Sequence, residues 1–151
     1  MARLGFKNLP AFKKRMHDRL IDNPQENLKT AMGRAVTLVR GEVVDSVSRA
    51  GTGETYQKYN PRRTHTAAVA GQPPASDLGV LRSGITIDVD VERGAVVGRI
   101  MAYAADGSGD NYAKHLEFGT TQMAARPFMQ PALDKNAKKI RGILSQRSIT
   151  K

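Results

Sequence analysis

The chain lacks cysteine altogether, so disulfide frameworks, thiolate nucleophiles and cysteine-ligated metal sites are excluded. It also lacks tryptophan, and aromatic residues make up only 5% of its 151 residues. A domain of this length buries roughly 68–70% of the surface that its unfolded chain exposes. Its core must therefore be built from Val, Ile, Leu, Ala and Met, with little large aromatic surface to bury. Stabilisation in part by neighbouring subunits fits this composition.

Long apolar runs are missing as well. The sequence contains no stretch of about 18 apolar residues, the length that a membrane-spanning helix needs. Residues 1–20 alternate basic and apolar side chains, without the uninterrupted apolar segment of a secretory signal. We therefore expect no membrane contact, and a protein that remains in the cytoplasm in which it is made.

Positive charge is concentrated at the two ends of the chain. The net charge is +10. Residues 1–40 hold nine Lys or Arg and three Asp or Glu, and residues 134–151 hold six and one, so these ends carry +6 and +5. The middle of the chain carries −1. Basic ends indicate an acidic partner, either nucleic acid or protein, although solvated helix faces produce the same pattern.

The strongest predicted element is a long helix. Asn23 suits the N-cap position, Pro24 the first helical position, and Glu26 can complete a capping box. The helix is expected to run to Ala50, where Gly51 follows and can adopt the left-handed conformation that closes helices. Its apolar stripe recurs every three or four residues: Leu28, Met32, Ala35, Val39, Val43 and Val47.

Three shorter helices are expected. The first begins near Pro10, with Phe12, Met16 and Leu20 on one face. Residues 112–118 predict a short helix that Gly119 closes, after a Gly-rich loop at residues 106–110. The last begins at Pro131, and residues 146–151 beyond it are polar and expected to fray. Its predicted apolar face holds Leu133, Ala137, Ile140 and Leu144.

Residues 51–84 show no periodicity and contain three Pro and several Gly. A structureless segment of this length is unusual within a compact domain, so we interpret it as an extended arm that contacts another subunit. The next residues alternate apolar with polar side chains from Ile85 to Glu92, which is typical of a strand with one solvent-facing side. Arg93-Gly94 predicts a turn and residues 95–101 a returning strand, which together make a β-hairpin.

Candidate chemical sites are weak. His115 and Glu117 have the His-x-Glu spacing of zinc deaminases, but that signature also needs a Pro-Cys-x-x-Cys segment. Asp88, Asp90 and Glu92 offer hard-cation ligands. Exposure on a two-faced strand explains these acids better, and no Gly-punctuated calcium loop surrounds them. We expect no catalytic residues, no metal ligands and no cofactor, so the chain is not predicted to be an enzyme.

The basic residues near the two ends could contact phosphates. No aromatic residues are interleaved with them to stack bases, so any binding of nucleic acid should be salt-sensitive and indifferent to sequence. A small, basic, non-specific nucleic-acid-binding protein is therefore the alternative functional hypothesis. The residues concerned are Lys13, Lys14, Arg15 and Arg19, and then Lys135, Lys138, Lys139 and Arg141.

Two segments are more specific: GQPPASDLGVLRSGI at residues 71–85 and YAKHLEFGTTQMAARPFMQPAL at residues 112–133. Together they resemble the phage tail-completion or head-tail joining proteins of lambda-like siphoviruses, and they cover about a quarter of the chain. The sequence departs from the family pattern at Ser83-Gly84, where the family has a residue followed by Ser. The matching residues are Pro73, Pro74, Gly79, Leu81, Arg82, Ile85, Tyr112, Ala113, Glu117, Phe118, Gly119, Thr120, Arg126, Pro127, Phe128, Pro131 and Ala132.

The resemblance implies an α+β fold, with a long N-terminal helix packed on a small antiparallel sheet, a C-terminal helix and a long irregular arm, in a single domain over residues 1–151. It implies a structural role: a ring of identical subunits, expected to be a hexamer, at the head-tail joint of a tailed phage. The expected partners are other copies of the chain, the tail-terminator and head-closure proteins and, non-specifically, packaged DNA. The expected location is the virion, after assembly in the host cytoplasm.

Interface or structural roles fall on the residues of these segments. Glu117 and Arg126 are expected to form an ion pair that fastens the 119–127 turn. Phe118 and Phe128 are expected to form one local aromatic cluster. The full set predicted for such roles is Leu81, Arg82, Tyr112, Glu117, Phe118, Gly119, Thr120, Arg126, Pro127, Phe128 and Pro131.

Overall fold

The computed structural model describes residues 10–14, 24–105 and 109–145. Residues 10–14 are helical. Asn23, Met16, Leu20 and the tail at residues 146–151 lie outside the described residues. The further elements, in chain order, are α2 (Pro24–Val47), β1 (Thr55–Tyr59), β2 (Arg62–Thr66), α3 (Val80–Ser83), β3 (Ile85–Glu92), β4 (Ala95–Ala102), α4 (Ala113–Phe118) and α5 (Met129–Ser145).

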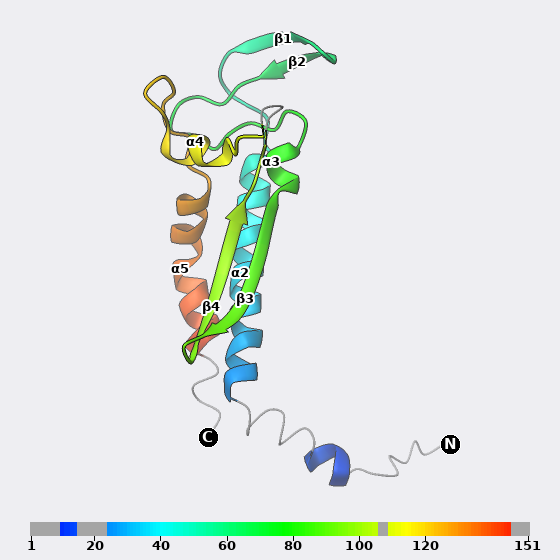
Figure 1. Cartoon of the computed structure of the whole chain (residues 1–151), viewed down its shortest axis with the longest axis vertical. Helices are drawn as coiled ribbons and strands as arrows, with labels where there is room; N and C mark the ends of the chain where they lie inside the picture. The colour runs from blue at the N-terminus through cyan, green and yellow to red at the C-terminus, as the bar shows by residue number, and fades with distance from the viewer. Residues whose placement is uncertain (1–9, 15–23, 106–108, 146–151) are drawn as a thin grey trace, which may run out of the picture.

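Helices α2 and α5 and the β3–β4 hairpin lie side by side along the long axis (Figure 1). Hairpin β1–β2 and helix α4 lie together at one end of this assembly (Figure 1). The α+β class is thereby confirmed, as are the N-terminal helix on a small antiparallel sheet and the C-terminal helix.

Helix α2 follows the predicted apolar stripe. Ala35, Val39, Val43 and Val47 are buried, whereas Leu28 at the start of the stripe is exposed. The helix ends at Val47, three residues before the predicted end. There the hydroxyls of Ser46 and Ser48 donate to the carbonyls of the last turns, and such local bonds compete with continuation of the helix.

Strands β3 and β4 form the predicted hairpin, paired from Ile85 with Ala102 to Glu92 with Ala95. Arg93 and Gly94 both have positive φ, 50° and 82°, the combination that a two-residue type I′ turn requires. One face of the hairpin packs on α2. Gly98 permits this close approach, because a Cβ at that position would lie 2.6 Å from Cγ1 of Val36.

The prediction that residues 51–84 are structureless was wrong in part. They contain the β1–β2 hairpin, with Thr55 paired to Thr66 and Tyr59 to Arg62, and the short helix α3. No alternation of apolar and polar residues marks β1 or β2, because polar side chains link the two strands. The Thr55 and Thr66 hydroxyls lie 3.0 Å apart, and Gln57 Nε2 donates to the Thr64 hydroxyl at 2.9 Å.

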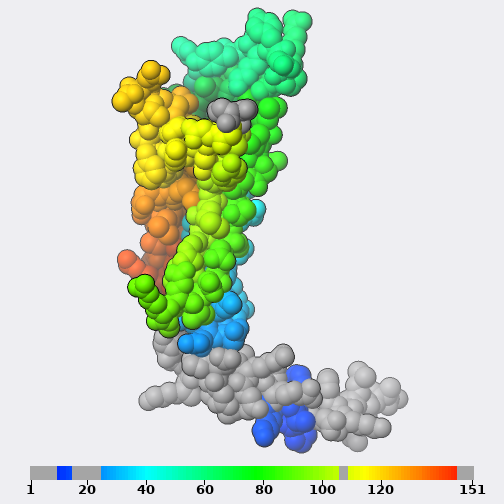
Figure 2. All heavy atoms as spheres, in the orientation of Figure 1, coloured from blue at the N-terminus to red at the C-terminus, as the bar shows by residue number. Residues whose placement is uncertain are grey.

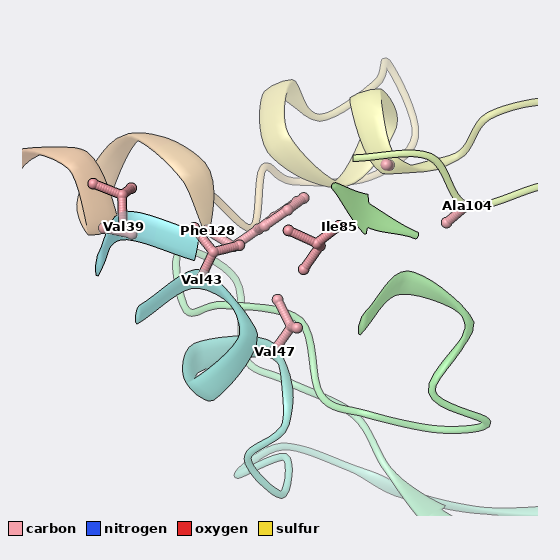
Figure 3. Packing of buried hydrophobic residues seen from close by; sticks show 8 residues of the cluster. Val39, Val43, Val47, Ile85, Ala104 and Phe128 are labelled. Carbon is pink, nitrogen blue, oxygen red and sulfur yellow. The ribbon is translucent and has the colours of Figure 1, made fainter. Parts of the chain in front are cut away.

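One core cluster joins α2, the β3–β4 hairpin, α4 and α5. Figure 3 shows Val39, Val43 and Val47 of α2 facing Ile85 and Phe128. The cluster is completed by small residues, which let the elements approach closely: Ala104, Ala113 and Ala132.

Helix α5 begins at Met129, two residues before the predicted Pro131. Its buried residues are Ala132 and Asn136, whereas the predicted Leu133 is exposed and Ala137 half-buried. The predicted Ile140 does pack against the core cluster, so the prediction of the packed face was wrong only at its start. Asn136 tolerates burial because its side-chain amide donates to the carbonyl of Ala132 at 2.9 Å. The face of α5 that packs on α2 therefore consists of a small residue and a hydrogen-bonded polar one, and Leu133 is 45% exposed.

Candidate functional site

The two motif segments, 71–85 and 112–133, meet around α4. Leu81 and Tyr112 pack against the core cluster, and Tyr112 is the N-cap residue of α4. Arg82 lies exposed on α3, and Pro131 is exposed in the first turn of α5. Far-apart parts of the sequence are thus brought to one end of the molecule, next to hairpin β1–β2 (Figure 1).

Glu117, in the last turn of α4, binds the N-terminus of α5. Its Oε2 accepts the backbone N–H groups of Phe128 at 2.8 Å and Met129 at 3.0 Å, and its Oε1 accepts that of Gln130 at 3.0 Å. These N–H groups have no partner within the helix, and a carboxylate is favoured there by the helix dipole. The predicted ion pair with Arg126 was wrong, because the backbone takes up both oxygens of Glu117.

The turn between α4 and α5 is held by its own backbone. Gly119 has φ 75° and closes α4 as predicted, and a Cβ there would lie 2.9 Å from the carbonyl oxygen of Met123. Thr120 exchanges backbone hydrogen bonds with Met123, and its hydroxyl also accepts the N–H of Gln122 at 3.2 Å. The turn projects from the same end of the molecule as hairpin β1–β2 (Figure 2).

Arg126 and the residue before it fasten this turn to other segments. The N–H of Arg126 donates to the carbonyl of Leu116 at 2.7 Å, and the N–H of Gly71 donates to the carbonyl of Ala125 at 2.9 Å. The Nε of Arg126 is buried and has no hydrogen-bond partner in the part of the chain that the structure describes. The two motif segments are therefore bonded directly to each other.

The two Phe residues of the motif have different environments, so the predicted Phe118–Phe128 cluster was wrong. Phe128 is among the most deeply buried side chains, whereas Phe118 is 81% exposed. Phe118 lies on the rim of an apolar hollow between β4, α4 and α5, which we call the β4–α5 hollow. Its volume is about 630 Å³, and it is lined by Val39, Val43, Gly98, Ile100, Ala102, Asn111, Ala113, Lys114, Glu117, Phe118, Pro127, Phe128, Met129, Gln130 and Leu133.

A second, more polar cavity of about 330 Å³ lies beneath hairpin β1–β2, and Leu81, Arg82, Tyr112 and Arg126 are among its lining residues. Asp77 at its edge accepts hydrogen bonds from Arg63 at 2.6 Å and Lys58 at 2.5 Å. These two cations hold the pKa of the Asp77 carboxyl well below its usual range. Asp77 thereby fixes the hairpin to the segment before α3. No pattern in the sequence marks this contact, because Arg63 and Lys58 lie 14 and 19 residues before Asp77.

The acidic residues considered as candidate ligands or catalysts have structural partners. Asp88 and Glu92 pair with Arg99 on the neighbouring strand, and Glu117 binds backbone as described above. Among residues 10–14, 24–105 and 109–145, no group of three or more His, Asp or Glu side chains is arranged to hold a metal ion. In the same residues, no helix is both long and apolar enough to cross a membrane.

The cations of α5 divide into two groups. Lys135 binds Glu42 of α2 at 2.6 Å, which fastens the two helices together and lowers the pKa of Glu42. Lys138, Lys139 and Arg141 are exposed, and the positive charge of Lys139 also contributes to the lowered pKa of Glu42. Of the basic residues predicted on the first helix, Lys13 and Lys14 are described and exposed, and Arg15 and Arg19 lie outside the described residues.

Comparison of the chain with protein-family models, with curated proteins and with solved structures gives no match.

Proposed function

We propose that the chain is a structural assembly subunit of a tailed phage, which joins other copies of itself in a ring at the head-tail joint. The observation that carries the proposal is the convergence of the two motif segments at one end of the molecule. Their polar groups hold the backbone, and they leave Phe118 exposed on the rim of an apolar hollow. A large exposed apolar residue beside such a hollow is typical of a protein-binding surface.

The rigidity of this end supports the same proposal. Glu117 and Gly119 fix the turn after α4, and Asp77 fixes hairpin β1–β2. Two projections held in this way can dock on a neighbour with little loss of conformational entropy. The partners we propose are the tail-terminator and head-closure proteins, and the location is the neck of the virion.

The test is complementation in a phage that encodes the chain, with Phe118→Asp against Phe118→Tyr. The aspartate places a charge on the proposed contact surface, and the tyrosine keeps the aromatic ring. We expect Phe118→Asp to fold normally by circular dichroism and to leave separate heads and tails under the electron microscope. Phe118→Tyr should give joined particles. Normal yields of joined particles with both variants would refute the role of this surface, and absence of the chain from purified virions would refute the neck assignment.

The alternative is a small nucleic-acid-binding protein, which the exposed cations Lys138, Lys139 and Arg141 on α5 favour. This function predicts a mobility shift of DNA that disappears as salt is raised, because counterion release dominates such binding. Replacing the three cations by Gln should abolish the shift. Under the assembly proposal, the same triple variant should still be incorporated into particles.

A further inference from the structure

The backbone hydrogen bonds of the β3–β4 hairpin leave both outer edges open. The N–H of Tyr103 donates to the carbonyl of Gly84, which makes these two residues a hydrogen-bonded pair. In an antiparallel ladder such pairs alternate with pairs whose N–H and C=O groups point outward. The pair of Ile85 and Ala102 therefore points outward, and Arg40 Nε accordingly reaches the carbonyl of Ile85 at 2.9 Å on the side away from β4.

Continuation of the alternation identifies the open groups. On the β3 edge they belong to Ile87 and Val89, and on the β4 edge to Val96, Gly98 and Ile100. These five residues make no backbone hydrogen bond on their outer side with any described residue. Two further outward groups are already hydrogen-bonded. On β4, the carbonyl of Ala102 accepts from Asn111 Nδ2, and on β3, the N–H of Val91 donates to the carboxylate of Asp90.

The two edges differ in what lies beside them. Next to β4 is the β4–α5 hollow, whose lining includes Gly98 and Ile100 of that strand, with Val39 and Val43 of α2 and Leu133 of α5. Helix α5 packs on α2, and Val96, Gly98 and Ile100 of β4 are half-buried. The β3 edge presents Ile87 and Val91, each 37% exposed.

Charge distinguishes the two sides in the same way. The solvent face of β3 carries Asp88, Asp90 and Glu92, and Arg99 is the cation that pairs with this row. The helix that borders the hollow carries the exposed cations Lys138, Lys139 and Arg141, beyond Leu133, the last residue of that helix in the hollow lining. The β3 edge is thus apolar and bordered by acids, and the part of α5 beyond the hollow is basic, so the flanks of the two sites are complementary in charge.

We propose that β3 of a second copy of this chain adds to the open edge of β4, antiparallel to it, in the hollow between β4 and α5. The backbone groups of the two edges then satisfy each other, and the neighbour's Ile87 and Val89 cover the apolar lining of the hollow. Because the edge that is offered differs from the edge that receives it, the contact is heterologous and repeats from copy to copy. The inference rests on the self-assembly part of the proposed function, and it gives the ring a continuous intersubunit sheet.

Proline variants test the contact, because a proline whose missing N–H would point outward leaves the β3–β4 ladder intact. Val89→Pro blocks the β3 edge and Ile100→Pro blocks the β4 edge. Light scattering after gel filtration should give a multimer for the unmodified chain and monomers for each variant alone. A mixture of the two variants should give a dimer of twice the monomer mass that grows no further, because one good edge of each kind remains.

Leu133→Glu provides a second block, since it introduces charge into the hollow without changing a strand. This variant should also be monomeric. Lys138→Glu changes charge on the same helix outside the hollow lining, so it should still assemble, with a lower affinity because one complementary cation is lost. Leu133→Glu takes the place of Ile100→Pro in the mixture if circular dichroism shows that Ile100→Pro has lost its helices.

Each result that would contradict the proposed contact has a different meaning. Val89→Pro dimers on their own would mean that β4 edges pair with each other, and Ile100→Pro dimers on their own that β3 edges do. Multimers of normal size in both variants, or an unmodified chain that is monomeric at every concentration, would overturn strand addition.

Virion incorporation is scored separately. Joined particles formed by Val89→Pro would overturn strand addition and leave the neck role intact, and strand addition by a chain absent from virions would do the reverse.

Discussion

The carboxylate of Glu117 accepts the backbone N–H of Phe128 at 2.8 Å across 11 residues of sequence. With the N–H groups of Met129 and Gln130, it satisfies the free end of α5 from the last turn of α4. The bond fixes the length of the intervening turn and places Phe128 in the core while Phe118 remains outside. One side chain therefore determines how the motif segment 112–133 is folded.

Removal of this carboxylate should destabilise the protein. We expect Glu117→Ala to lower the free energy of unfolding by about 2 kcal/mol, since it leaves helix N-terminal N–H groups without an acceptor. Glu117→Gln keeps one acceptor oxygen and should lose less. Urea unfolding followed by circular dichroism measures both, and an Ala variant as stable as the parent would contradict the capping role.

The attachment of hairpin β1–β2 should depend on pH. Hydrogen bonds from Arg63 and Lys58 lower the pKa of Asp77 in the folded state, so its contribution is fully present above the ordinary carboxyl pKa. It is lost as the pH falls below about 4, where the unfolded chain takes up the proton first. The protection of the β1 and β2 amides from hydrogen exchange, expressed relative to the intrinsic exchange rate at each pH, should fall over this range in the parent. In Asp77→Asn it should be low already at neutral pH, and equal protection in the two proteins at neutral pH would argue against the contact.

Charge in the middle of the α2 stripe should unfold the subunit. Val43 is 0% exposed and lies in the core cluster, so Val43→Asp buries a carboxylate without a partner at a cost of about 3–5 kcal/mol. Thr37→Asp on the exposed side of the same helix is the control and should be within about 0.5 kcal/mol of the parent. Thermal unfolding distinguishes the two, and an unchanged melting temperature for Val43→Asp would be incompatible with the packing of α2.

Any side chain at position 98 should separate the sheet from α2. A Cβ there would lie 2.6 Å from Val36 Cγ1 and 2.8 Å from Met32 Cγ, so we expect Gly98→Ala to cost about 1–3 kcal/mol. Gly142→Ala in α5 is the matched control, because no described atom outside the helix's own backbone and the neighbouring residues lies within 4 Å of its added Cβ. It should stabilise the protein by up to about 1 kcal/mol through helix propensity. Equal melting temperatures for the two variants would show that the approach of β4 to α2 is looser than the structure has it.

The sequence by itself determined the elements whose stability is local or periodic. Val39, Val43 and Val47 recur at helical spacing, and the same spacing brings them to one buried face, so α2 was predictable. The β3–β4 hairpin was predictable from its alternation and from Arg93-Gly94, since a type I′ turn needs positive φ at both positions. Gly119 likewise marked the end of α4.

Only the tertiary structure decided which side chains of the motif are buried, exposed or bonded. Hairpin β1–β2 has no apolar period, because cross-strand polar pairs and the distant Asp77 stabilise it. In the first turn of α5 the buried residue is Ala132 and not the predicted Leu133, because close approach to α2 favours the smaller side chain. Glu117 binds backbone N–H groups, which no residue spacing reveals, since every residue but proline carries one. Spacing along the chain encodes contacts within an element, whereas these contacts depend on where separate elements meet.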